Sequence, residues 1–374
     1  MVSVPLVDLG LQHRRIAEEV RQGWAGVIAR TDFVLGEDVG EFEREYAAFT
    51  HVGHCVGVAN GTDALELALR AVGLGVGDEV IVPTNSFVAS ALAVRRIGAV
   101  PALVDVDAEY LLMEPEAVAA RMGPRVRAIM PVHLFGQVAP MREVTALATA
   151  SGCTIIEDAA QAQGATQDGV AAGALGTVAG TSFYPGKNLG AYGDAGAVLT
   201  SDGAIAARVR ALRNYGSESK YEHPEPGFNS RLDTLQAVVL RAKLRRLAEW
   251  NRERCDAAAR YDDLLDDLEE VRRPAERAGN GHVWHLYVVR VPGRDAVLRS
   301  LHEQGIGVSI HYPLPIHLQG AFADLGHRPG DFPVAERAAS EILSLPIFPG
   351  ITAAQQESVA SALRLALRAS RGPE

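Results

Sequence analysis

The chain has 374 residues, of which 48% are hydrophobic, and a formal net charge of −10 from 46 acidic and 36 basic residues. This length and composition predict a large globular core with more than one lobe. The acidic balance argues against a broad basic surface for nucleic acid, so small-molecule or protein partners are expected.

The cysteines and the apolar segments indicate the cellular setting. Cys55, Cys153 and Cys255 are odd in number and far apart, without a C-x-x-C pair, so they are expected to be reduced structural thiols and no metal site is predicted. The N-terminal apolar stretch contains Asp8 and lacks a basic leader, and no run of about 18 apolar residues occurs. Neither a signal peptide nor a membrane span is therefore expected, and the protein is predicted to be cytoplasmic.

Apolar strand-like runs alternate with helix-like stretches from about residue 54 onward. The predicted strands are residues 54–59, 79–83, 100–106, 127–133, 153–158, 180–185 and 196–201. Helix-like segments between them include residues 62–73 and 88–98. Strands that are apolar throughout and are separated by helices predict an α/β domain, with a mostly parallel sheet covered on both faces.

The pattern changes at Leu232, where a long, charged, helix-like stretch begins. Beyond it the sequence predicts a strand over residues 282–291, a helix, a second strand near residues 305–312 and a terminal helix. The chain is accordingly divided into a large α/β domain, residues 1–245, and a smaller α+β domain, residues 246–374.

The stretch GTSFYPGKNLG presents Lys187 at the end of a predicted strand. Such a lysine can be a solvated turn residue, a phosphate-binding residue or a covalent amine. The phosphate-loop motif requires Gly six residues before the lysine and Ser or Thr directly after it. Those positions hold Thr181 and Asn188, so the phosphate-loop reading fails.

Further candidate residues lie at other strand ends, where open parallel sheets bind their ligands. One strand leads into Gly61 and Thr62 at the start of a helix, whose N–H groups can face an anion, although Thr62 or Asp63 can instead be a helix cap. Another strand ends near Asp158 and Gln161. Asp158 can pair with a cationic ring nitrogen, with Gln161 reaching the same ligand, or it can cap the next helix.

Together these groups predict pyridoxal phosphate as the cofactor. This cofactor requires an amine for a Schiff base, a carboxylate for the pyridinium proton, and phosphate donors at a helix N-terminus. Ser182, five residues before Lys187, offers a hydroxyl for the phosphate. Phe87 can stack on the ring, although a lone phenylalanine is also typical of a core.

Several sequence blocks, in order along the chain, resemble the signature blocks of the DegT-type (StrS-like) nucleotide-sugar aminotransferases. They include NGTDALELAL, PVHLFGQ, IIEDAAQAQGA, SFYPGKNLGAYGDAGA, RNYGSESKYEH, NSRLDTLQAVVLR and IHYPLPIHLQ. The resemblance covers about residues 4–370. It implies the fold type I of pyridoxal-phosphate enzymes in the aspartate aminotransferase superfamily, with a mostly parallel mixed sheet between helices and a smaller C-terminal domain.

The resemblance also implies roles for individual residues. Lys187 matches the Schiff-base lysine, Asp158 the partner of the pyridine nitrogen, and Gln161 the residue beside the ring hydroxyl. The matched phosphate ligands and stacking residue are Gly61, Thr62, Ser182 and Phe87. Asn229 matches an asparagine that reaches the phosphate of the neighbouring subunit's cofactor, which implies a homodimer with shared active sites.

Substrate positions are implied in the same way. The matching residues of the sugar-nucleotide site are Tyr215, Lys220, His311, Tyr312 and His317. Lys220 would contact the diphosphate. Each of these residues has an alternative role in surface or lobe packing.

The implied reaction moves an amino group from an amino acid, glutamate by analogy, to a keto-deoxyhexose on thymidine diphosphate (TDP), with pyridoxamine phosphate as the intermediate form of the cofactor. The keto group can be at C3 or C4, with the wording SFYPGKN slightly favouring C3, or a cyclitol ketone can be the substrate. Dehydratase relatives carry histidine in place of the lysine, so Lys187 argues against elimination. Intact Lys187, Asp158 and Gln161 argue against a non-catalytic regulatory role.

Overall fold

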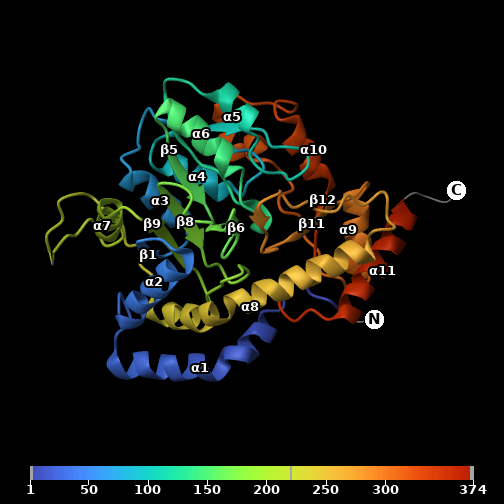
Figure 1. The fold of residues 1–374 in the computed structure, drawn as a ribbon, viewed down its shortest axis with the longest axis horizontal. Helices are drawn as coiled ribbons and strands as arrows, with labels where there is room; N and C mark the ends of the chain where they lie inside the picture. Colours follow the sequence, from blue (N-terminus) through green and yellow to red (C-terminus); the bar gives the residue numbers. More distant parts are fainter. Residues whose placement is uncertain (1–2, 220, 371–374) are drawn as a thin grey trace.

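A seven-stranded sheet forms the centre of the molecule (Figure 1), in a computed structural model that describes residues 3–219 and 221–370. Its strand order is β1-β9-β8-β5-β4-β2-β3. The strands are β1 (His54–Val58), β2 (Glu79–Pro83), β3 (Val100–Val104), β4 (Val126–Ile129), β5 (Thr154–Asp158), β8 (Val178–Ser182) and β9 (Gly196–Thr200). Strand β9 runs antiparallel to β1 and β8, whereas the other neighbours pair in parallel. The predicted α/β class and all seven predicted strands are confirmed.

Helices cover both faces of this sheet, as the apolar strands require. On β2, Val80 and Val82 pack in a cluster with residues of α3 and α4, whereas Ile81 between them packs in another cluster with residues of α5 and α6. Alternate residues of a strand point to opposite faces, so both faces of β2 are buried. The helices that cover the sheet include α3 (Gly61–Ala71), α4 (Val88–Arg96), α5 (Pro115–Arg121), α6 (Met141–Ser151) and α7 (Gly203–Leu212), the last of which packs in the same cluster as α3.

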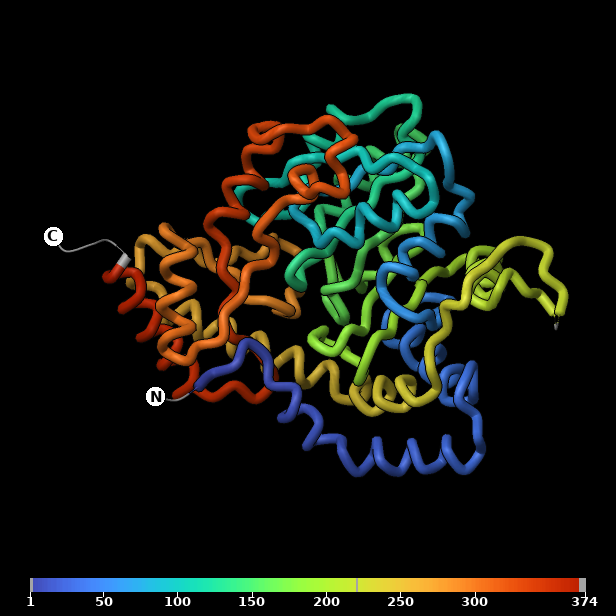
Figure 2. Tube along the Cα trace, turned by 180° about the vertical axis from the view of Figure 1, so that it is seen from behind, coloured from blue at the N-terminus to red at the C-terminus, as the bar shows by residue number. Residues whose placement is uncertain are grey.

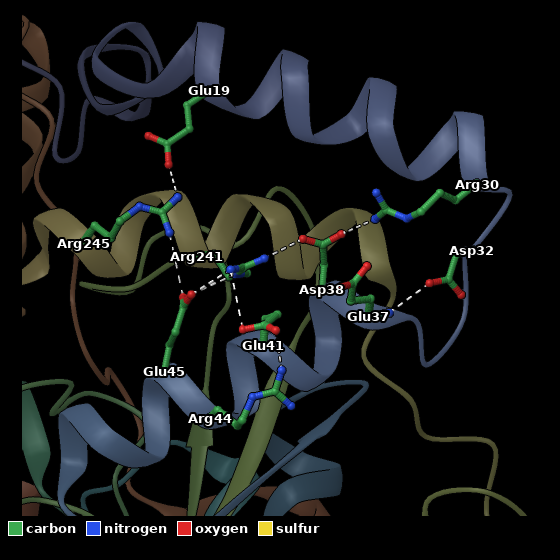
Figure 3. Close-up of polar contacts among 10 residues, drawn as sticks. All are labelled: Glu19, Arg30, Asp32, Glu37, Asp38, Glu41, Arg44, Glu45, Arg241 and Arg245. Atoms are coloured by element: carbon green, nitrogen blue, oxygen red, sulfur yellow. Dashed lines mark hydrogen bonds and ion pairs between the residues drawn. The ribbon is translucent and has the colours of Figure 1, made fainter.

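Two N-terminal helices lie against one long helix beneath the sheet (Figure 1). They are α1 (Leu9–Arg30) and α2 (Glu37–Thr50), and the long helix is α8 (Thr234–Leu264). Arg241 of α8 pairs with Asp38 at 2.7 Å and with Glu45 at 2.8 Å, and Arg245 pairs with Glu19 of α1 (Figure 3). This network links α8 to α1 and to α2, which lie on opposite sides of α8 in Figure 3.

The C-terminal lobe is built on a two-stranded antiparallel sheet. Its elements are β11 (Tyr287–Arg290), α9 (Arg294–Glu303), η2 (Ile316–Leu318), η3 (Gly320–Leu325), α10 (Pro333–Glu341), β12 (Ile342–Leu345) and α11 (Ala353–Ser370). The prediction of a second strand near residues 305–312 is wrong, because β12 is the partner of β11. The backbone of residues 305–312 divides its hydrogen bonds between Val4 on one side and Ser344 on the other, so it makes only isolated bridges.

Shorter elements connect the parts of the chain. They are η1 (Leu134–Gly136), β6 (Thr166–Gln167), β7 (Val170–Ala171) and β10 (Asn280–Gly281), the last three forming a small sheet. Helix α8 runs continuously through residue 245, and the division into residues 1–245 and 246–374 stays a prediction. In the part of the chain that is described, no helix is long and apolar enough to span a membrane.

The connection between α7 and α8 projects from the body of the molecule. Figures 1 and 2 show it from opposite sides, extending away from the C-terminal lobe. The projection begins and ends where Asn214 pairs with Asn229. Of the residues at its base, Tyr215 and Asn229 are exposed, whereas Ser230 is buried.

Candidate active site

Lys187 lies in the turn that follows β8. Its backbone N–H donates to the carbonyl of Tyr184 at 2.8 Å, and a Cβ on Gly190 would lie 2.3 Å from the carbonyl oxygen of Pro185. The turn is therefore closed tightly, and the Lys187 amine lies within the electrostatic reach of Asp158. Burial lowers the pKa of Lys187 to about 8, a fall that the charge of Asp158 partly offsets. At this pKa a larger fraction of the amine is uncharged near neutral pH than in an ordinary lysine, and the uncharged form is the one that acts as a nucleophile or base.

Asp158 ends β5 with its side chain almost fully buried, at 4% exposure. Its Oδ2 atom accepts a hydrogen bond from Ser90 Oγ at 2.7 Å, and its Oδ1 atom accepts one from the Ala160 N–H at 3.1 Å. No α-helix follows Asp158 directly, since residues 159–164 form turns. The alternative role of Asp158 as a helix cap is thus excluded, and its carboxylate remains available to a ligand.

The orientation of the Gln161 amide is fixed by its neighbours. Its Oε1 atom accepts a hydrogen bond from the Phe135 N–H at 2.6 Å, so its Nε2 atom is the donor that faces Tyr312 Oη, 3.1 Å away. The Tyr312 ring lies 5.2 Å from the ring of Phe87, centroid to centroid. Phe87 is 51% exposed, so one face of an apolar ring is open to a planar ligand.

A cradle for an anion lies where α3 begins. Asn60, and neither Thr62 nor Asp63, caps this helix by accepting from the Asp63 N–H at 2.8 Å. Within the described part of the chain, the N–H groups of Gly61 and Thr62 have no acceptor. A Cβ on Gly61 would lie 2.5 Å from the Ser182 Cβ, so only glycine allows the Ser182 hydroxyl to approach these N–H groups.

Two histidines lie within the electrostatic reach of Lys187. Burial, followed by the positive charge of Lys187, lowers the pKa of His311 to about 4. The same two causes lower the pKa of His285 well below its ordinary value. Burial and the negative charge of Asp158 raise the pKa of Tyr312. The imidazole rings of His311 and His285 are therefore neutral at physiological pH. The structure brings His311 and Tyr312 together with Lys187 and Asp158.

Other residues named from the sequence lie farther from this cluster. Both ring nitrogens of His317 are engaged, by Thr84 at 2.9 Å and by Glu336 at 3.0 Å. Tyr215 and Asn229 lie at the exposed base of the projecting segment, and no described hydrogen bond joins either side chain to Lys187. Lys220 lies outside the described residues. The substrate roles of these residues stay predictions.

Reasoning from the sequence missed several residues of the site. Ser90 contacts Asp158, and Asn188 forms a hydrogen-bond network with Asn251 and with His285 of the C-terminal lobe. Only the folded chain places Ser90 against Asp158 and His285 within the electrostatic reach of Lys187. Among the residues that the structure describes, no group of three or more His, Cys, Asp or Glu side chains is arranged to hold a metal ion.

This donor set fits pyridoxal phosphate. It combines an amine of lowered pKa, a buried carboxylate, an amide donor, an open aromatic face and a cradle of N–H and hydroxyl groups. The model of the DegT/DnrJ/EryC1/StrS aminotransferase family matches residues 14–364. The chain belongs to this family. Its members are aminotransferases that depend on pyridoxal phosphate, and the resemblance, the cofactor and the transaminase activity expected from the sequence are confirmed.

Relatives are similar over nearly their whole length. The erythromycin biosynthesis sensory transduction protein EryC1 of Saccharopolyspora erythraea is 45% identical over 363 residues, covering 97% of this chain and 99% of the relative. The dTDP-3-amino-3,4,6-trideoxy-alpha-D-glucose transaminase of Streptomyces venezuelae is 44% identical over 361 residues, covering 96% and 95%. The crystal structure of S. venezuelae DesV in complex with a ketimine intermediate has a TM-score of 0.96 and 42% identity, and both chains are covered completely. The fold type I expected from the sequence is confirmed.

Proposed function

We propose that this aminotransferase moves an amino group from L-glutamate to a TDP-linked 3-keto-deoxyhexose in the biosynthesis of aminodeoxysugars. The observation that carries the proposal is the position of Lys187, an amine of lowered pKa at the end of β8, beside the Asp158 carboxylate at the end of β5. The name of the S. venezuelae relative, a 3-amino-sugar transaminase at 44% identity, supports the 3-keto position and the TDP carrier.

Lys187 is proposed to move the protons of the reaction. When bound, pyridoxal phosphate supplies an aldehyde for the amine and a ring that withdraws electrons from the bond being broken. Lys187 Nζ takes the proton from the α-carbon of the amino acid and later returns a proton to the carbon of the ketosugar. Its lowered pKa of about 8 suits both directions, because the amine can be charged or neutral near the working pH.

The other groups hold the cofactor in place. Asp158 would accept a hydrogen bond from the protonated ring nitrogen, and the Nε2 atom of Gln161 would donate a hydrogen bond to the ring hydroxyl. The exposed Phe87 ring would stack on the cofactor. The phosphate would be bound by the Gly61 and Thr62 N–H groups and by the Ser182 hydroxyl at the start of α3, where the helix dipole favours negative charge.

The substrate sugar would enter between the strand ends and the C-terminal lobe. His311, kept neutral beside Lys187 and hydrogen-bonded to Ser344 Oγ at 2.8 Å, can accept or donate a hydrogen bond to a sugar hydroxyl. Lys220 is proposed to bind the diphosphate of the substrate, and Tyr215 to contact the outer part of the substrate. A role of His317 in the same site is indirect in this chain, because Thr84 and Glu336 occupy its ring nitrogens.

A homodimer with shared sites is part of the proposal. Asn229 is exposed at the base of the projecting segment, and its neighbour Ser230 bonds Asp63 at 2.7 Å beside the phosphate cradle. The segment is thus fixed next to the cradle of its own chain while the Asn229 side chain faces outward. This placement suits a side chain that reaches the phosphate of a second copy.

The proposal is tested with a substrate panel. The purified enzyme, loaded with pyridoxal phosphate, is given glutamate, glutamine or alanine together with TDP-linked or UDP-linked 3-keto and 4-keto hexoses, the free ketosugars or a keto-inositol. Mass spectrometry of the product gives kcat/KM for each pair. The highest kcat/KM is expected for glutamate with the TDP-linked 3-ketosugar, and equal values for the free sugar would refute the nucleotide-sugar assignment.

A further inference from the structure

Two buried serine hydroxyls connect to the carboxylate of Asp158. Ser90 Oγ lies 2.7 Å from Asp158 Oδ2, and Ser86 Oγ lies 2.6 Å from Ser90 Oγ. Ser90 is fully buried and Ser86 is 3% exposed.

The chemistry of the groups fixes the direction of this chain. A charged carboxylate only accepts hydrogen bonds, so the single proton of the Ser90 hydroxyl points at Asp158. The short contact between the two serines then requires Ser86 to donate to Ser90. Its alternative acceptor, the Phe87 carbonyl, is farther away at 3.3 Å. The two hydroxyl dipoles align head to tail, an arrangement in which each bond strengthens the next.

The same turn of the chain carries the aromatic face of the site. Phe87 is the N-cap of α4, and the Ser90 N–H donates to its carbonyl at 3.2 Å. Ser86 precedes this N-cap and Ser90 lies in the first turn of α4, and their 2.6 Å contact brings the two hydroxyls to one side of that turn. A single turn therefore fixes the position of the Phe87 ring relative to the carboxylate that Ser90 holds.

We propose that Ser90, supported by Ser86, is a positioning residue that holds the Asp158 carboxylate oriented toward the cofactor's ring nitrogen. The proposal rests on the role given to Asp158 above. Ser90 occupies Oδ2 and the Ala160 N–H occupies Oδ1, so both oxygens are fixed, yet each retains a lone pair for a further donor. Without Ser90 the carboxylate, which is 4% exposed, would lose its one described side-chain donor.

The test compares cofactor binding by Ser90→Ala and by the wild type. Titration of each apoenzyme with pyridoxal phosphate, followed by visible absorbance, should show a Kd about tenfold higher for Ser90→Ala, as expected for a loss of roughly 1.4 kcal/mol. Ser86→Ala should change the Kd in the same direction by a smaller factor. Ser90→Thr, which keeps the hydroxyl, should restore wild-type affinity.

A second readout separates positioning from a purely structural role. With nitrogen-15 in the pyridine ring, NMR of the bound cofactor reports whether the ring nitrogen is protonated. The wild type should give the protonated chemical shift, and Ser90→Ala should move it toward the unprotonated value. Thr50→Val is the matched control, because it removes a buried hydroxyl that donates only to the Tyr46 and Ala47 carbonyls of α2. It should leave both the Kd and the chemical shift unchanged.

The outcomes distinguish this inference from the proposed function. A Kd and a nitrogen chemical shift of Ser90→Ala equal to those of the wild type would overturn the inference while leaving the cofactor assignment intact. Failure of the wild type to bind pyridoxal phosphate would overturn the proposed function itself. If Ser90→Ala does not fold, Ser86→Ala decides by the same two measurements.

Discussion

Asn188, the residue after Lys187, donates a hydrogen bond from its Nδ2 atom to the Oδ1 atom of Asn251 on α8 at 2.9 Å. The same Nδ2 atom also donates to the Val283 carbonyl at 2.9 Å, and Asn188 Oδ1 lies 3.2 Å from His285 Nδ1. Asn251 in turn donates to the Gln163 carbonyl at 2.9 Å. The turn that presents Lys187 is therefore held at once by α8, by the C-terminal lobe and by the chain that follows β5.

Asn188→Ala should destabilise the protein by about 1–3 kcal/mol, because it leaves buried partners without their hydrogen bonds. Denaturant unfolding of the apoenzyme measures the loss. The double variant Asn188→Ala/Asn251→Ala should lose less than the sum of the two single variants, since the residues share a bond. Strict additivity would show that the pair is not coupled.

Asp158→Asn should keep the fold but lower kcat of the glutamate half-reaction by about 100-fold or more. An amide cannot stabilise a positive charge on the ring nitrogen, so the electron-withdrawing power of the cofactor falls. Stopped-flow absorbance of the bound cofactor after addition of glutamate gives the rate, and circular dichroism checks the fold. A rate within about threefold of the wild type would show that Asp158 has no catalytic role in this half-reaction.

Lys243 offers a prediction on the pH dependence of stability. It is buried on α8 with its nitrogen 5.0 Å from the centroid of the Tyr192 ring, and burial lowers its pKa to about 8 from 10.5. Between these two values the unfolded chain binds more protons than the folded chain, so this residue makes the free energy of unfolding rise with pH. At lower pH the folded chain carries the buried positive charge of Lys243, which lowers the free energy of unfolding.

Lys243→Met should therefore be more stable than the wild type at pH 7, and its advantage should shrink between pH 8 and 10.5. Urea unfolding of both proteins at several pH values measures the difference. A difference that stays constant across this window would show that the pKa of Lys243 is not lowered.

Subunit mixing tests the crossing of Asn229. Inactive Lys187→Ala subunits are mixed with inactive Asn229→Asp subunits, which places both defects in one site of the heterodimer and leaves the other site intact. Activity should recover only if Asn229 serves the partner's site. With heterodimers shown by native mass spectrometry, absence of recovery would mean that each chain builds its own phosphate site.

The strands of the large sheet could be predicted from the sequence because they are apolar throughout and end in polar clusters. Lys187, Asp158 and Gln161 follow from that pattern, since parallel strands bring their ends to one edge of the sheet. The Ser90 contact with Asp158 joins residues 68 positions apart, and no local pattern indicates it. Likewise, residues 305–312 look like a strand, but only the folded chain shows that one part of this segment bonds Val4 and another part bonds Ser344, so that no continuous ladder forms.

The dependence of amino transfer on Lys187 is measured most directly with nitrogen-15-labelled glutamate and a TDP-linked 3-ketohexose. Borohydride reduction of the resting enzyme should first attach the cofactor to the peptide that contains Lys187, and to neither of the other two lysines, Lys220 and Lys243. The wild type should then yield a TDP-aminosugar that carries the label, and Lys187→Ala should yield none. An unlabelled sugar product from the wild type, or labelled product at the wild-type rate from Lys187→Ala, would contradict the account in which Lys187 holds the cofactor and moves the protons while glutamate supplies the nitrogen of the aminosugar.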